Sequence, residues 1–397
     1  MAEVAAGVGP DALHAQLRVA MVAGEASGDL LAALLLQGAR AHWSQLHGVG
    51  IGGPQMQAEG FEAWWPSERL AVHGYSLEVF KRVAGLLRIR RQLGTRLLAQ
   101  RPDVFIGVDA PDFNLGLERR LRAGGIPTVH FVCPSIWAWR PERVHAIRAA
   151  ADHVLCLFPF EPALLAEHGI AATFVGHPLA NAIADDVSMG QARTALGLAH
   201  DAPVLALLPG SRSKEIDYLL PRFLAAAAQL RRQWPNLQLV LPAVAAQAER
   251  IARLIQVQPL QPPVRILAGQ SHQALAACDV TLIASGTATL EAALFKKPMV
   301  ISYAMHPLSA WLMRRKQLQP WVGLPNILLR EQIVPELLQD AATPEALAAE
   351  VDRWLHAATE RDARWQTLRC RFGDLHRSLR ADTAQAAAQA IGQVLGR

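Results

Sequence analysis

The chain has 397 residues, of which 51% are hydrophobic and 18% are charged, and its formal net charge is +5. This composition excludes a wholly disordered chain and can fill sizeable cores, and the length predicts two domains. The charge is too small to indicate nucleic-acid binding, and no segment approaches the roughly 18–20 consecutive apolar residues that a membrane-spanning helix needs.

Short apolar runs alternate with longer segments of helical period in both halves of the chain. Strands are predicted at residues 18–22, 104–108, 128–132, 154–157, 173–175, 204–208, 237–241, 264–267, 280–283 and 299–302. Such strands, separated by helices, predict an α/β fold of two doubly wound domains with parallel sheets. Because the pattern breaks off between residues 177 and 190, we expect domains at residues 1–188 and 189–361, followed by a helical tail at residues 362–397.

A basic stretch lies between Glu78 and Asp103, where the sequence has seven Lys or Arg residues and no acidic residue. Apolar residues recur among these charges at roughly helical spacing. A helix with apolar and Arg-rich faces suits anionic lipid headgroups, and the alternative is a solvated helix packed on the sheet. The candidates for membrane docking are Val79, Phe80, Lys81, Arg82, Val83, Leu86, Leu87, Arg88, Arg90 and Arg91.

The loops of the first half carry acidic and aromatic residues. Asp109 directly follows the strand at 104–108, where a carboxylate could act as a general base. Its alternative role is helix capping, because the nearby Pro111 suits the first turn of a helix. Asp112 is a rival acid. The candidates for an acceptor site or cleft are Glu25, Ser27 and Trp137, although a Trp at this spacing is also typical of core packing.

Two loops of the second half are suited to a pyrophosphate. Gly210, Ser211 and Arg212 follow the strand at 204–208, and Ser285, Gly286 and Thr287 follow the strand at 280–283, with Glu291 one helical turn further on. Helix N-termini and guanidinium groups favour phosphate oxygens, and a carboxylate can accept hydrogen bonds from ribose hydroxyls. The alternatives are ordinary strand-to-helix turns and a Glu that complements the helix dipole.

Two further patterns are weak indicators. The GxGxxG of Gly48, Gly50 and Gly53 does not follow the first strand, so it gives little support to a dinucleotide oxidoreductase. The four cysteines form no CxxC pair, and the N-terminal segment lacks the basic start and apolar core of a signal peptide. We therefore expect a cytoplasmic protein with reduced thiols and no metal site.

Short motifs spread along the chain carry a resemblance to a known family. They are VAGEASGD at 22–29, GGPQM at 52–56, DAPDFN at 109–114, PSIWAWR at 134–140, LPGSR at 208–212, ASGTATLE at 284–291 and LPN at 324–326. Together, and in this order, they resemble the lipid-A-disaccharide synthase family over nearly the whole chain. The resemblance implies a GT-B fold, in which two Rossmann-like domains face a central cleft and the C-terminal helix returns to the N-terminal domain.

The resemblance also implies an activity. An inverting glycosyltransferase of this family would condense UDP-2,3-diacylglucosamine with 2,3-diacylglucosamine 1-phosphate (lipid X), giving the β-1,6-linked lipid A disaccharide 1-phosphate and UDP, without a metal or other cofactor. Its first domain would bind the acceptor and the membrane, and its second domain the UDP-sugar. By match to the motifs, Asp109 would be the base, and the residues around UDP would be Arg212, Ser285, Thr287, Glu291 and Asn326. One departure is Ala304 after Tyr303, where the family usually has Arg or Lys.

The same resemblance implies partners and a location. They are the two lipid substrates and the anionic cytoplasmic face of the inner membrane, on which the protein would be peripheral; a homodimer is a further option, and nucleic acid is not expected. One alternative function is another UDP-sugar enzyme of this fold, such as a UDP-N-acetylglucosamine epimerase or a transferase with a soluble acceptor. A second is a non-enzymatic peripheral membrane protein, which the acidic and basic loop residues argue against.

Overall fold

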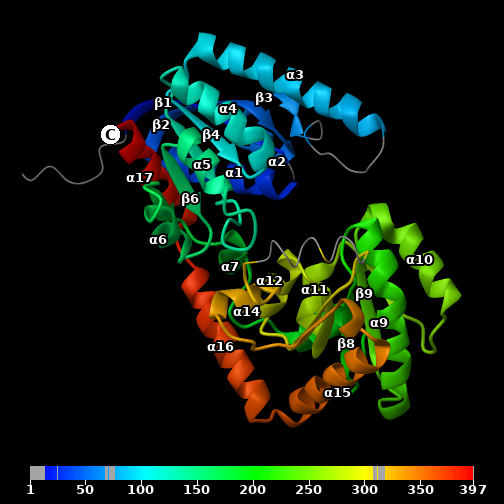
Figure 1. Ribbon diagram of the computed structural model, residues 1–397. Coiled ribbons are helices and arrows are strands. Elements are labelled where there is room, and N and C mark those ends of the chain that lie inside the picture. The colour runs from blue at the N-terminus through cyan, green and yellow to red at the C-terminus, as the bar shows by residue number, and fades with distance from the viewer. Residues whose placement is uncertain are drawn as a thin grey trace, which may run out of the picture. The chain divides into compact units, whose positions relative to one another are not determined.

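The computed structural model describes residues 14–24, 26–67, 70, 77–306, 311 and 318–396, and for 14–15, 26 and 77–83 it describes the backbone alone (Figure 1). The chain forms two compact units. The first comprises Met1–Pro178 and Leu379–Arg397, and the second comprises Leu179–Ser378. Among the described residues, no helix combines the length and the apolar character needed to cross a membrane.

The first unit is built on a seven-stranded parallel sheet with the order β3-β2-β1-β4-β5-β6-β7. Its strands are β1 (His14–Ala23), β2 (Trp43–Gly52), β3 (Glu62–Pro66), β4 (Val104–Val108), β5 (Thr128–Phe131), β6 (His153–Cys156) and β7 (Ala172–Phe174). Its helices are α1 (Ala26–His42), α2 (Pro54–Ala58), α3 (Leu77–Gln100), α4 (Pro111–Ala123), α5 (Arg143–Ala150), α6 (Glu161–Ala166) and α17 (Thr383–Leu395).

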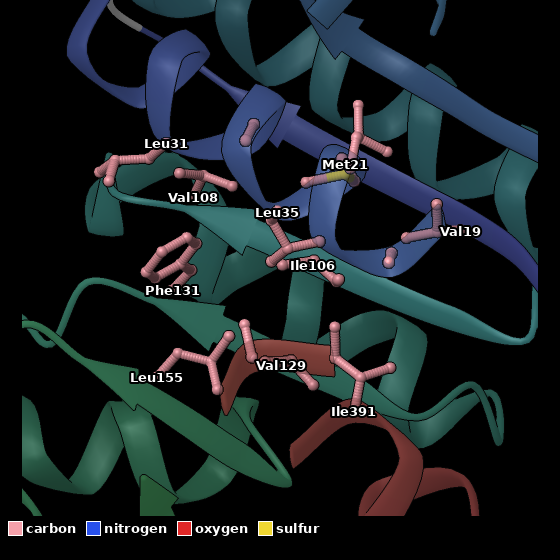
Figure 2. Close-up of a cluster of buried hydrophobic side chains, with 14 of the residues drawn as sticks. Val19, Met21, Leu31, Leu35, Ile106, Val108, Val129, Phe131, Leu155 and Ile391 are labelled. Carbon is pink, nitrogen blue, oxygen red and sulfur yellow. The ribbon is translucent and has the colours of Figure 1, made fainter. Parts of the chain in front are cut away.

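Helices α1 and α17 pack together over one face of this sheet, although they come from opposite ends of the chain. Figure 2 shows Leu35 of α1 and Ile391 of α17 among side chains of β1, β4, β5 and β6. Both side chains are buried, and full burial of a side chain of this size stabilises a fold by about 1.5–3 kcal/mol. On the other face, Leu93 of α3 and Leu117 of α4 pack against Phe105. The sheet is therefore doubly wound, as predicted.

Strand β2 was not predicted, because its three glycines and its polar residues obscure the apolar pattern. The structure gives those glycines a packing role. A Cβ on Gly48 would lie 2.8 Å from the Phe61 ring, and a Cβ on Gly50 would collide with the backbone oxygen of Met21. Gly53, the third glycine of the GxGxxG, lies against the Asp29 carboxylate, which accepts a hydrogen bond from its amide at 2.8 Å. This GxGxxG therefore serves strand packing and the start of α2.

The second unit is built on a six-stranded parallel sheet with the order β10-β9-β8-β11-β12-β13. Its strands are β8 (Val204–Leu208), β9 (Gln238–Ala243), β10 (Arg265–Ala268), β11 (Val280–Ala284), β12 (Met299–Tyr303) and β13 (Glu336–Leu338). Its helices are α7 (Pro178–Ala182), α8 (Met189–Ala195), α9 (Ser213–Gln233), α10 (Ala248–Val257), α11 (Ser271–Ala277), α12 (Thr287–Leu294), α14 (Leu324–Leu329), α15 (Pro344–Glu360) and α16 (Ala363–Leu379), with short 3-10 turns at Ala245–Gln247 and Gln339–Ala341. Helices α9 and α15 pack on each other and on β11 and β12.

The units divide the chain at other residues than those expected from sequence. The first boundary falls between Pro178 and Leu179 instead of after residue 188, and the tail is divided. Helix α16 lies in the second unit up to Ser378, where the buried His376 hydrogen-bonds the backbone oxygen of Ala180 at 2.7 Å. Only the segment from Leu379 belongs to the first unit, because α17 packs on α1.

Candidate active site

Each sheet has a topological switch point, where the strand order changes direction. In the first unit it lies between β1 and β4, and in the second it lies between β8 and β11. Ligands of open α/β sheets bind beyond the carboxyl ends of the strands at such points. The loops after these four strands contain the first and third motifs of the chain and its two pyrophosphate motifs. The structure therefore brings the two predicted nucleotide loops together and places Asp109 beside the loop after β1.

Asp109 is half-buried, and the backbone around it is strained. Asp109 and the next residue, Ala110, have φ values of 52° and 43°, a left-handed conformation that residues with a Cβ rarely adopt. The Asp109 amide donates to the backbone oxygen of Phe131 at 2.8 Å, and the Asn114 side chain donates to the backbone oxygen of Asp109 at 2.8 Å. The N-cap of α4 is Ala110, so the Asp109 carboxylate does not cap that helix. Strain of this kind is typical of active sites.

The loop after β1 lies against this turn. A Cβ on Gly24 would be 3.4 Å from the Ala110 Cβ. Ser27 is exposed in the first turn of α1, which makes it accessible to a ligand at this edge, whereas Glu25 lies outside the described residues. Asp112, the rival acid, is exposed and pairs with Arg143 at 2.5 Å. Asp109 is therefore the acid that the backbone holds at the switch point.

A buried polar cluster lies behind Asp109. Glu118 of α4 and His130 of β5 are fully buried and form a contact of 2.7 Å between Oε1 and Nδ1. Burial raises the pKa of Glu118, and the charge of His130 opposes that rise. Glu118 Oε2, His130 Nε2 and Asn114 Oδ1 have no hydrogen-bond partner within the described part of the chain. Sequence reasoning missed this pair, because its two members lie in separate elements.

The two tryptophans of the PSIWAWR motif have different environments. Trp137 is 8% exposed, donates to Glu161 Oε1 at 2.9 Å and packs edge-on against Phe158 and Phe160. The core-packing alternative therefore describes Trp137, which is not exposed to an acceptor. Burial raises the pKa of Glu161 to about 7. Trp139, in contrast, is 45% exposed.

Cys133, Cys156 and Glu161 form a buried group of possible metal ligands, with their ligand atoms within 4.8 Å of one another. Cys133 directly follows Val132, which has a φ of 80°, and packs in the same buried cluster as Cys156. Both Glu161 oxygens already accept hydrogen bonds, from Trp137 and from the Phe158 amide. Sequence spacing predicted no such site, because Cys133 lies in the loop after β5 and Cys156 ends β6, far apart in the chain.

At the switch point of the second sheet, the loop after β8 turns at Gly210, which has a φ of 106°. A Cβ there would lie 2.5 Å from Glu215, so glycine is required for space as well as for conformation. Ser211 is exposed beside it, and Arg212 is the N-cap of α9, with a side chain that is 81% exposed. Arg212 Nη1 donates to Glu215 Oε1 at 2.9 Å.

The loop after β11 presents exposed backbone at Gly286 and Thr287, where α12 begins. Gly286 has a φ of 152°, and a Cβ there would meet no atom within 4 Å, so a ligand can approach this backbone. The Ser285 hydroxyl donates to the Val322 oxygen at 2.9 Å. Glu291 contacts His272 at 3.2 Å, and this interaction raises the pKa of His272.

Asn326 is fully buried, and its side chain is used entirely within the chain. Its amide nitrogen donates to the Val334 oxygen and to Glu336, and its oxygen accepts from the amides of Ile333 and Val334, all at 2.8–3.1 Å. The structure thus places Asn326 as the residue that holds the loop before β13. It does not bring the Asn326 side chain to the exposed edge with Arg212 and Gly286.

Tyr303 is a site candidate that sequence reasoning left without a role. It ends β12, next to β11 in the sheet, and its hydroxyl is influenced by Glu215 and Arg212. Burial is the main reason that the pKa of Tyr303 is raised. Ala304, the departure from the family pattern, is buried directly after it. The sequence could have indicated Tyr303 only by its position, because this residue stands at the end of a strand next to the switch point.

Helix α3 carries the basic stretch. Its Leu93 and Leu97 are buried against the sheet, whereas Leu87 is 50% exposed, so the helix has an inner and an outer apolar region. A groove of about 430 Å³ is lined by Leu87, Arg90, Arg91, Gly116, Leu117, Arg119, Arg120 and Ala123, between α3 and α4. Leu86 is partly buried and Arg88 is exposed. The side chains of Val79, Phe80, Lys81, Arg82 and Val83 lie outside the described residues.

Comparisons with known proteins give a consistent result. A family model for lipid-A-disaccharide synthetase matches residues 19–391. The lipid-A-disaccharide synthase of Verminephrobacter eiseniae is 62% identical over 384 residues, which cover 97% of this chain and 99% of that protein. The lipid-A-disaccharide synthase of Albidiferax ferrireducens is 59% identical over 379 residues, which cover 96% of this chain and 97% of that protein.

Solved structures share the fold at low sequence identity. An S. aureus MnaA–UDP structure has a TM-score of 0.60 and 13% identity, and covers 94% of each chain. A glycosyltransferase from Rickettsia africae has a TM-score of 0.57 and 11% identity, covering 96% of this chain and 99% of its own. A UDP-GlcNAc 2-epimerase from Neisseria meningitidis, bound to UDP-GlcNAc, has a TM-score of 0.57 and 12% identity, covering 95% and 99%. The chain therefore has a GT-B fold, as expected.

Proposed function

The chain belongs to the lipid-A-disaccharide synthetase family, and from this premise we propose that it transfers 2,3-diacylglucosamine from UDP to the 6-hydroxyl of 2,3-diacylglucosamine 1-phosphate. The products are the β-1,6-linked disaccharide 1-phosphate and UDP. One observation carries the assignment of roles: each unit presents one half of the required chemistry at its switch point. The first holds Asp109, and the second holds Arg212 beside two helix N-termini.

The acceptor hydroxyl is a weak nucleophile until it loses its proton. In an inverting transfer, Asp109 takes this proton while the hydroxyl oxygen attacks the anomeric carbon and the bond to UDP breaks. The left-handed turn at Asp109 and Ala110 is tied to β5 and to Asn114 by backbone hydrogen bonds, which would hold the backbone of the base in place before substrate arrives. A fixed base avoids the cost of orienting it during the reaction.

The leaving group is a pyrophosphate, on which negative charge accumulates as the bond breaks. The Arg212 guanidinium and the amides that begin α9 and α12 are donors suited to phosphate oxygens. Open backbone at Gly286 lets the β-phosphate approach closely, and Gly210 permits the turn that exposes Ser211. In this assignment Glu291 accepts from the ribose, and Asn326 acts indirectly by holding its loop.

Proteins with the rival UDP-sugar functions share the fold of this chain, but their sequences are not closely related to it. The solved epimerase structures are about as similar to this chain as other proteins of this fold, at 10–12% identity, whereas relatives named lipid-A-disaccharide synthase reach 62% and span nearly the whole chain. A lipid acceptor is also favoured by the Arg-rich α3, which a soluble acceptor would not need.

The transfer is tested directly with purified protein, UDP-2,3-diacylglucosamine and 2,3-diacylglucosamine 1-phosphate. We expect UDP release that depends on both substrates, together with a disaccharide product seen by mass spectrometry. An incubation with UDP-N-acetylglucosamine alone is the control for epimerisation. If UDP appears without a disaccharide, or if only the control substrate changes, the transfer assignment is wrong.

We further propose that α3 binds the anionic membrane surface on which the lipid substrates lie, which would make the protein peripheral on the cytoplasmic face. Support comes from the exposed Leu87 next to Arg88 and Arg91, and from the basic groove between α3 and α4. Each arginine that contacts anionic headgroups at a membrane surface contributes about 1 kcal/mol to binding, and this contribution weakens with salt.

Membrane docking is tested by replacing Arg88, Arg90 and Arg91 with Glu and measuring sedimentation with vesicles that contain phosphatidylglycerol. We expect much weaker binding, and a loss of salt dependence. Replacing the exposed Arg232, Arg253 and Arg265 of the second unit with Glu changes the net charge equally and is the matched control. Equal losses in both triple variants would show that only net charge matters.

A further inference from the structure

Trp139 projects from the loop between β5 and α5. It is 45% exposed, unlike its buried neighbour Trp137. The Arg140 guanidinium lies 4.4 Å from the centre of its ring, and that of Arg143 lies 5.6 Å away. A guanidinium stacked on an aromatic face keeps its N–H groups in its own plane, where they remain available to an anion.

Positive charge exceeds negative charge at this place. Asp112 Oδ1 pairs with Arg143 at 2.5 Å, and the Asp112 backbone oxygen lies 3.4 Å from Arg90 Nη1 on α3. Arg140 forms no ion pair with any residue that the structure describes. Arg143 and Arg90 therefore both contact Asp112, whose carboxylate is itself 87% exposed, and a third guanidinium, that of Arg140, lies over the Trp139 ring that Arg143 also faces. Clustered arginines of this kind repel one another until an anion binds, so the cluster indicates an anion site.

The backbone of the loop is arranged to keep this group outside the core. Arg140 has a φ of 51°, a left-handed conformation that costs energy in a residue with a Cβ. The preceding Ile136 and Trp137 are buried, which anchors the loop. A purely structural cation–π contact would not require the strained turn or the exposed ring, because both groups could lie flat against the surface.

We propose that Trp139, Arg140 and Arg143 form a phosphomonoester subsite that recognises the phosphate of the acceptor. This inference rests on the proposed function, in which the acceptor is an acylated glucosamine with a phosphate at its anomeric carbon. Arg140 and Arg143 donate to the phosphate oxygens, Asp112 orients Arg143, and the exposed face of Trp139 packs against the sugar or its acyl group.

The topology agrees with this assignment. Asp109 follows β4, and the Trp139 loop follows β5, its neighbour in the sheet. The attacking 6-hydroxyl and the anomeric phosphate are attached on the two sides of the ring oxygen of one sugar, so the base and the phosphate site must lie close together. Arg90 of α3 lies 3.4 Å from the Asp112 backbone oxygen, so the basic residues of the candidate membrane helix lie next to the subsite.

The test compares two acceptors, 2,3-diacylglucosamine 1-phosphate and the same molecule without its phosphate. Charged hydrogen bonds to phosphate change binding by about 10- to 100-fold. We expect the wild-type protein to prefer the phosphorylated acceptor in kcat/KM by at least about 10-fold. Arg140→Ala should remove most of this preference by raising the KM for the phosphorylated acceptor, while the KM for the UDP-sugar and the rate with the other acceptor stay near wild type.

Further variants separate recognition from folding. Arg140→Lys keeps the charge and should restore part of the preference, and Trp139→Ala should weaken both acceptors equally. Arg148→Ala, an exposed arginine of α5 outside the subsite, is the matched control and should change nothing. If Arg140→Ala slows both acceptors by the same factor, the subsite is wrong and Arg140 is structural. If the wild-type protein forms no disaccharide, the proposed function fails, and the subsite fails with it.

Discussion

At the switch point of the second sheet, the loops are held by their own hydrogen bonds, whereas at that of the first sheet the chain turns through strained backbone. The Ser285 hydroxyl donates to the Val322 oxygen, and Arg212 pairs with Glu215. At the first edge, Asp109, Ala110 and Arg140 all have positive φ. Both arrangements hold parts of the chain in place before a ligand binds. The first edge holds the segment that carries the base, and the second holds the donors to the pyrophosphate.

The difference matches the chemistry assigned to each edge. A leaving pyrophosphate needs several donors that stay in place, which a satisfied loop network provides, since the network leaves helix amides facing outward. A base needs one carboxylate held in one direction, which a strained turn provides at a cost of order 1–3 kcal/mol per residue. The comparison predicts that substitutions at the first edge mainly change kcat and acceptor use, and that those at the second change donor binding or stability.

The largest expected effect is that of Asp109→Asn. General-base catalysis contributes about 10²- to 10⁴-fold, so kcat should fall by at least about 100-fold while UDP affinity, measured by calorimetry, stays within about twofold. The exposed Glu167 lies in the same unit, and Glu167→Gln is the control for loss of a carboxylate. Turnover that survives in Asp109→Asn would assign the base to another acid and break the comparison.

The next effect concerns Asn326 and separates a structural role from a contact with the nucleotide. Asn326→Ala leaves the buried amide of Val334 without its acceptor, removes one of the two acceptors of the Ile333 amide, and takes away the donor to the Val334 oxygen and Glu336; each unsatisfied buried group costs about 1–3 kcal/mol. We expect the free energy of unfolding of the second unit to fall by about 2–4 kcal/mol in urea titrations. Asn236→Ala, at an exposed position, is the matched control. Unchanged stability with weakened UDP binding would instead place the Asn326 side chain on the nucleotide.

Arg212→Ala should act on donor binding alone. Loss of a charged donor to the pyrophosphate weakens UDP binding by about 10- to 100-fold, with little change in stability because the side chain is exposed. The control is Arg250→Ala, since Arg250 also pairs with a single surface carboxylate, that of Asp217. An Arg212→Ala variant that binds UDP normally but uses the acceptor poorly would reverse the roles of the two edges.

Strand positions were predictable because parallel strands are continuous apolar runs with sharp ends. The runs at β4 and β8 were predicted to the residue, and placing their loops at sheet edges followed from the fold class. Strand β2 was not predicted because its glycines are needed where Phe61 and Met21 approach the strand closely, and these two residues are distant from those glycines in sequence. Long-range packing of this kind leaves no local pattern to read.

The candidate site was partly predictable for the same reason. Residues that directly follow a strand, such as Asp109, Arg212 and Gly286, could be found from position. The environment of a side chain could not, because it depends on which other elements pack around it. Trp137 and Trp139 have the same sequence context, yet Phe158, Phe160 and Glu161 bury only the first.

The smallest effect concerns His272 and reports whether Glu291 changes partner. Because Glu291 raises the pKa of His272 above its ordinary value, the interaction stabilises the fold fully below about pH 6.5 and is lost as the pH rises through the raised pKa. Glu291→Gln should therefore lower the pKa of His272, measured by NMR, and weaken the fold only at the acidic side of that range. Saturating UDP should also lower it, since ribose hydroxyls would share the carboxylate. His200, in the same unit, is the internal control. If UDP leaves the pKa of His272 unchanged, Glu291 serves the fold, and the nucleotide is held by Arg212 and the helix amides alone.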